Sequence, residues 1–77
     1  MSKPRVTLKQ RNALIETRAA GRLVRRRDGW APQDRGYGAH GFQTVHSLIE
    51  RGLLVKGQKP LDYQVSLTRL GREAIGK

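Results

Sequence analysis

The sequence predicts an α+β fold with three helices and a small antiparallel sheet. Residues 7–20 and 42–51 place apolar side chains at helical spacing, and 68–76 begin with a threonine that can cap a helix. Two short segments, 53–56 and 63–67, flank a stretch of turn residues, which is typical of a β-hairpin. The chain has 77 residues and no cysteine, so we expect one small domain without disulfides.

Residues 1–6 are predicted to be a flexible basic arm, and residues 7–77 to form the domain. The first helix begins with a capping box. The hydroxyl of Thr7 can accept a hydrogen bond from the backbone of Gln10, whose side chain can reach back to Thr7. Gly21 is a natural stop for this helix. Its core-facing stripe is predicted to contain Leu8, Ile15 and Ala19, with Leu14 at the edge.

The segment after the first helix is less regular. Residues 22–26 are predicted to form a strand, and the dipeptide Asp28-Gly29 favours a tight turn, so this strand is interpreted as half of a small hairpin. The lone Trp30 is expected to anchor the core. Residues 31–41 contain three glycines and one proline, and they are predicted to be a loop.

The second half of the chain has clearer periodicity. The helix over 42–51 should end at Gly52 and be followed by the hairpin and the last helix. Gly71 lies inside the last helix, where glycine is unfavourable, so we expect a close contact there. The residues expected to face the core from these two helices are Phe42, Val45, Leu48, Ile49, Leu67, Leu70 and Ala74, with Ile75 nearby.

Two motifs in this half resemble a known family. Residues 44–54, TVHSLIERGLL, are similar to a recognition helix that runs into a strand, and residues 65–74, VSLTRLGREA, to a return strand and its following helix. Together they resemble the winged helix-turn-helix domain of MarR-type regulators over residues 42–76. The resemblance implies a recognition helix over 42–51 and a wing between the two strands. That family also has a supporting helix before the recognition helix, at the position of residues 31–41 here.

The residues predicted to contact nucleic acid follow from this arrangement. If the apolar side of the recognition helix faces the core, short polar groups and one arginine face outward, where they can bond base edges or phosphates. Basic residues of the first strand and the wing can neutralise phosphates. The predicted contacts are Gln43, Thr44, Ser47 and Arg51 on the helix, Arg25, Arg26 and Arg27 on the strand, and Lys56 and Lys59 on the wing.

Charge favours the same class of partner. Sixteen Lys and Arg against six Asp and Glu give a formal net charge of +10, which suits a polyanion. Neither a secretory signal nor an apolar run of the roughly 20 residues that span a membrane is seen, so a cytoplasmic protein without a membrane partner is predicted.

Enzyme chemistry is not expected. The six acids are dispersed, and His40 and His46 match no zinc spacing, so they are interpreted as surface residues and no metal or catalytic group is predicted. Residues 36–41 spell G-x-G-x-x-G, but the chain is too short for a dinucleotide-binding domain, and this motif is interpreted as a loop without a cofactor.

The function predicted from these patterns is binding of double-stranded DNA by a small transcriptional regulator or accessory factor. Two alternatives stay open at this point. One is a winged helix that serves as a protein-interaction or assembly module without reading DNA. The other is a binder of structured RNA or the ribosome. A homodimer is compatible with any of the three.

Overall fold

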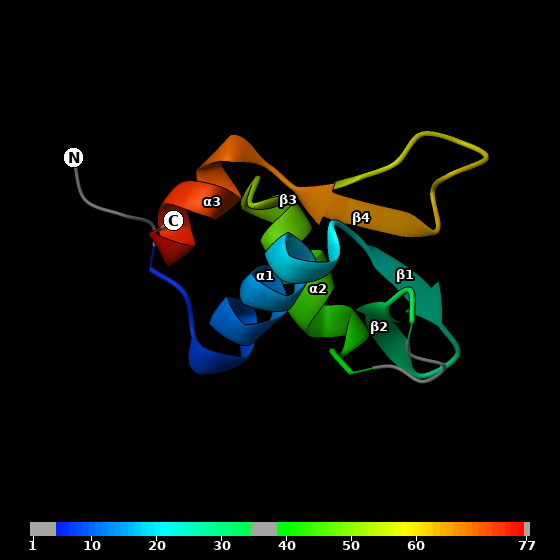
Figure 1. The fold of residues 1–77 in the computed structure, drawn as a ribbon, viewed down its shortest axis with the longest axis horizontal. Helices are drawn as coiled ribbons and strands as arrows, with labels where there is room; N and C mark the ends of the chain where they lie inside the picture. The colour runs from blue at the N-terminus through cyan, green and yellow to red at the C-terminus, as the bar shows by residue number, and fades with distance from the viewer. Residues whose placement is uncertain (1–4, 35–38, 77) are drawn as a thin grey trace.

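Three helices and a four-stranded antiparallel sheet make up the computed structural model, which describes residues 5–34 and 39–76. The predicted α+β class is confirmed, and the layout is compatible with a winged helix whose wing is the β3–β4 hairpin (Figure 1). In chain order the elements are α1 (Leu8–Ala20), β1 (Leu23–Arg26), β2 (Gly29–Pro32), α2 (Phe42–Glu50), β3 (Leu54–Lys56), β4 (Gln64–Leu67) and α3 (Arg69–Ile75).

The sheet has the strand order β2-β1-β4-β3. Two hairpins, β1–β2 and β3–β4, are joined side by side through the pairing of Leu23 with Val65. Figure 1 shows the tips of both hairpins at one end of the molecule, opposite α3. Residues that are far apart in the sequence therefore meet at the hairpin end.

Strand β2 corrects the prediction that residues 31–41 are wholly loop. All four of its residues are buried, so they lack the apolar and polar alternation that identifies a half-exposed strand. Pairing with β1 and a bridge between Trp30 and His40 hold it in the sheet. A side chain at Gly29 would lie 2.3 Å from the carbonyl oxygen of His40, so only glycine fits this close approach.

The helix that would precede a recognition helix is not seen in the described part of residues 31–41. Residues 31–32 belong to β2, residues 33–34 form a turn, and residue 40 forms the bridge to Trp30. The β1–β2 hairpin thus lies between α1 and α2 in chain order. Residues 35–38, which hold part of the G-x-G-x-x-G motif, lie outside the described residues.

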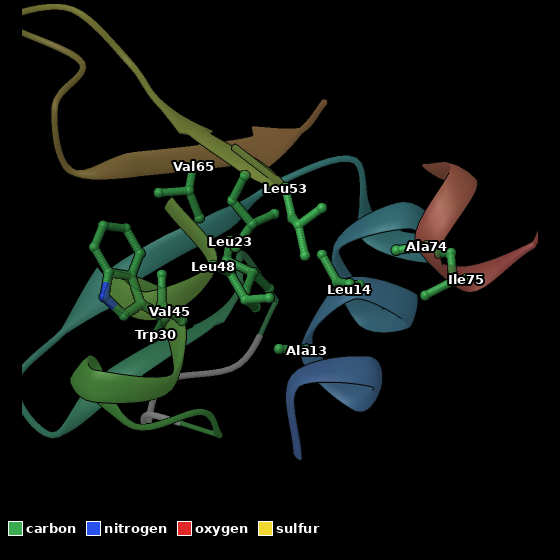
Figure 2. Close-up of a cluster of buried hydrophobic side chains, with 11 residues drawn as sticks. Ala13, Leu14, Leu23, Trp30, Val45, Leu48, Leu53, Val65, Ala74 and Ile75 are labelled. Carbon is green, nitrogen blue, oxygen red and sulfur yellow. The ribbon is translucent and has the colours of Figure 1, made fainter. Parts of the chain in front are cut away.

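The core lies between the helices and the sheet (Figure 2). Trp30 is 5% exposed and lies beside Val45 at the hairpin end, as expected for a core anchor. Ala74 and Ile75 lie at the other end of the cluster, on α3, which packs against α1. The buried cluster comprises Ala13, Leu14, Leu23, Trp30, Val45, Leu48, Leu53, Leu54, Val65, Ala74 and Ile75.

In α1 the capping box is confirmed, but the predicted apolar stripe is rotated. The buried residues are Ala13, Leu14 and Thr17, whereas Leu8 is 74% exposed and Ala19 is also exposed. Thr17 can be buried because its hydroxyl donates a hydrogen bond of 2.6 Å to the carbonyl of Ala13. The helix therefore meets the core along two small residues and one leucine, while Ile15 of the predicted stripe is half-buried against it.

Two of the residues expected in the core from α2 and α3 are partly exposed: Phe42 by 44% and Leu70 by 40%. The contact expected at Gly71 is confirmed, since a side chain there would lie 2.2 Å from the carbonyl oxygen of Leu53. The hydroxyl of Thr68 caps α3 through the amide of Gly71 and donates to the carbonyl of Gly52. This explains physically why threonine and glycine occur in the LTRLG segment.

Candidate nucleic-acid interface

Helix α2 buries Val45 and Leu48 and has a different environment on each side of this ridge. On one side, which we call the closed flank, Ser47 and Arg51 contact the start of α1. The side-chain nitrogen of Gln10 donates to the Ser47 hydroxyl at 3.2 Å, and Arg51 Nη1 donates to the side-chain Oε1 of Gln10 at 3.2 Å. Arg51 Nη2 also donates to the backbone carbonyl of Arg5.

Gln10 links these contacts to the capping box of α1. Its Oε1 accepts from the amide of Thr7 at 3.0 Å and also from Arg51, while its nitrogen donates to Ser47. One glutamine therefore ties the first turn of α1 to the second half of α2. The polar groups of Ser47 and Arg51 are used inside the chain, a role that sequence reasoning missed.

The other side of α2, the open flank, borders a hollow of about 340 Å³. Apolar side chains form its floor, and polar or charged side chains form its rim. Its lining residues are Arg25, Trp30, Phe42, Gln43, His46, Ile49 and Lys56. Three strands and one helix thus contribute to one surface, and this surface includes three of the nine predicted contact residues, Arg25, Gln43 and Lys56.

Strand register explains why Arg25 and Lys56 share this surface. Leu23 pairs with Val65 in β4, and Val65 pairs with Lys56 in β3, so the three share one face of the sheet. Arg25 lies two residues after Leu23 and pairs with Trp30, which places it on the same face. This face is apolar beneath the helices and becomes basic toward the hairpin tips.

Other predicted contacts lie away from the hollow. Arg26 follows Arg25 and points to the opposite face of the sheet, where its Nη2 donates to the carbonyl of Gln33 at 3.0 Å. Its buried Nε has no hydrogen-bond partner among the residues that the structure describes. Arg27 is exposed in the β1–β2 turn, and Lys59 is exposed in the wing loop.

Sequence reasoning did not identify Phe42, His46 and Ile49 as residues of one site. Their spacing of four and three residues is helical and could have indicated one face of α2, but Phe42 and Ile49 were predicted to be core. His46 is exposed and lies 3.6 Å from Glu50, one turn later on the helix. Their common surface becomes visible only with the sheet in place.

His40 corrects the expectation of a surface histidine. Its side chain is 12% exposed, and its Nε2 lies 2.7 Å from a carboxylate oxygen of Glu16 in α1. Its backbone pairs with Trp30 at the same time. This pair fixes the chain before α2 against α1, which is a structural role.

In the described residues, no cluster of three or more His, Cys, Asp or Glu side chains could hold a metal ion. In the same ranges, 5–34 and 39–76, every helix is too short or too polar to cross a membrane.

Comparisons of the chain with protein-family models, with curated proteins and with solved structures found no match.

Proposed function

We propose that this protein binds double-stranded DNA with its hairpin end, as a small regulator or accessory factor built like a MarR-type winged helix. The observation that carries the proposal is the meeting of Arg25 and Lys56, from two different hairpins, beside Gln43 on the open flank of α2. Cations that converge from separate elements onto a helix side suit a ligand with regularly spaced phosphates.

The charge distribution supports this proposal. The formal net charge of +10 gives the chain a strong attraction for a polyanion. Arg27 and Lys59 are exposed in the connections of the two hairpins, whose tips lie at the same end of the molecule (Figure 1). In the proposed complex, these two cations contact the DNA backbone together with Arg25 and Lys56, beside the open flank of α2.

Base reading is assigned to the open flank of α2. The amide of Gln43 is exposed and can bond the edge of adenine through one donor and one acceptor. Thr44 is half-buried and is placed at the margin of the contact. Ser47 and Arg51 are assigned to holding α2 in position, because both already have partners within the chain.

A second candidate function is favoured by that same closed flank. Two of the four helix residues predicted to face DNA contact α1. A domain that docks a protein partner has no need of a free polar stripe on this helix. Absence of DNA binding would favour this candidate.

The test is a titration of random-sequence duplex DNA at two salt concentrations. Four phosphate contacts predict that log K falls against log salt with a slope of about −3.6, which is a loss of roughly a hundredfold between 50 and 200 mM. No binding to duplex DNA even at low salt would overturn the proposal. Tighter binding to duplex RNA of the same sequence would transfer it to RNA.

A further inference from the structure

We infer that the hollow on the open flank accepts one unpaired nucleotide, so that DNA with a single-stranded tail binds more tightly than the same duplex with blunt ends. This inference rests on the proposed function and names the form of DNA that the site prefers.

The floor provides a surface for an aromatic base. Phe42 borders the hollow and is 44% exposed, and Ile49, which also lines the hollow, is half-buried. Trp30 completes the floor but is only 5% exposed, because its ring belongs to the core. Phe42 is therefore the aromatic ring on which a base can stack.

The rim provides the chemistry for a phosphate and for a base edge. Arg25 and Lys56 lie on the sheet side of the hollow and attract an anion. Gln43 and His46 lie on the helix side and carry hydrogen-bonding groups that can reach a base edge. An apolar peptide would leave these cations unpaired, whereas a nucleotide combines a flat base with a phosphate.

Size and base pairing restrict the occupant further. A volume of about 340 Å³ is near the lower end of small-molecule sites, which suits one nucleotide rather than several. A base inside a duplex is covered on both faces by its neighbours and cannot reach a recessed ring without leaving the stack. An unpaired base in a single-stranded tail can reach the ring without the free-energy cost of leaving a duplex.

The test compares three DNAs with the same duplex: blunt, with a short single-stranded tail, and with an abasic tail that keeps the phosphates. Stacking of one base is worth about 1–3 kcal/mol, so the complete tail should raise the affinity by about fivefold or more. The abasic tail should give a smaller gain, because it lacks the group that stacks on Phe42. Equal gains from both tails would mean that charge alone attracts the tail, and this would overturn the inference.

Variants locate the effect at the hollow. Phe42→Ala should reduce the gain from the complete tail to that from the abasic tail, while Phe42→Trp should keep the full gain. Leu70→Ala removes a side chain of similar exposure, 40%, from α3 and should also keep it. A full gain in Phe42→Ala would overturn the inference, and circular dichroism checks that each variant is folded.

The same experiment separates this inference from the function on which it rests. If none of the three DNAs binds at low salt, the proposed function fails. If the blunt duplex binds and the complete tail adds nothing, DNA binding stands and the nucleotide site is rejected.

Discussion

The two flanks of α2 carry similar polar side chains and use them differently. On the closed flank, Ser47 and Arg51 are bound by Gln10, which comes from the first turn of another helix. On the open flank, Gln43 and His46 are exposed beside Arg25 and border a hollow. The chemical type of a side chain therefore does not decide whether it is bonded within the chain or left exposed. The neighbouring element decides it.

The largest effect is expected from the buried ridge that separates the flanks. Leu48 is fully buried, and Leu48→Ala should lower the free energy of unfolding by about 3 kcal/mol, because it leaves a cavity between α2 and the core. Urea denaturation measures this loss. Leu70→Ala serves as the control and should cost less than about 1 kcal/mol because Leu70 is 40% exposed. Equal losses in both variants would contradict the assigned packing.

The next effect distinguishes the flanks by DNA affinity. The double variant Arg25→Gln with Lys56→Gln should weaken duplex binding by about tenfold or more at low salt and reduce the salt slope by nearly 2, because two phosphate contacts are lost. Arg51→Gln should weaken it by less than about threefold, since Arg51 already bonds to Gln10. Fluorescence anisotropy measures both changes.

A matched control keeps the change in net charge the same. Lys9→Gln with Arg18→Gln removes two exposed cations from α1, and neither residue borders the hollow. This pair should weaken binding less than the double variant at the hollow. If Arg51→Gln proved as harmful as the double variant, the distinction between the flanks would be wrong.

The smallest effect concerns the closed flank alone. Gln10→Ala removes one half of the capping box and the bridge to Ser47 and Arg51, and we expect a loss of about 1 kcal/mol in unfolding free energy. Thermal unfolding followed by circular dichroism measures it. Gln58→Ala, an exposed glutamine in the wing, should stay within about 0.5 kcal/mol of the parent. A Gln10→Ala variant as stable as the parent would show that the bridge has no structural role.

Local signals in the sequence predicted much of the fold. The Thr7 and Gln10 pair correctly marked the start of α1, and the turn residues between 53–56 and 63–67 correctly indicated the second hairpin. The constraint at Gly71 was also predictable, because glycine inside a helix needs a reason. Each of these signals lies within a few residues of the feature that it predicts.

Features that depend on distant segments could not be predicted in this way. The Asp28-Gly29 turn correctly indicated a hairpin after residues 22–26, but strand β2 is buried throughout and has no alternation, so its extent to Pro32 and its bridge to His40 were hidden in an apparent loop. The closed flank depends on Gln10, which is 37 residues before Ser47 in the sequence. The hollow needs α2, β1, β2 and β3 together, and so its apolar floor was assigned to the core.

The sheet is open, and its two outer strands differ in how they meet other molecules. On the outer edge of β2, the bridge to His40 already uses the backbone N–H and carbonyl of Trp30. Strand β3 has only three residues and ends at Lys56, so it offers a foreign chain little backbone to pair with and a positive charge that opposes a second copy. Lys56 thus discourages self-association at the same place where it would attract a phosphate.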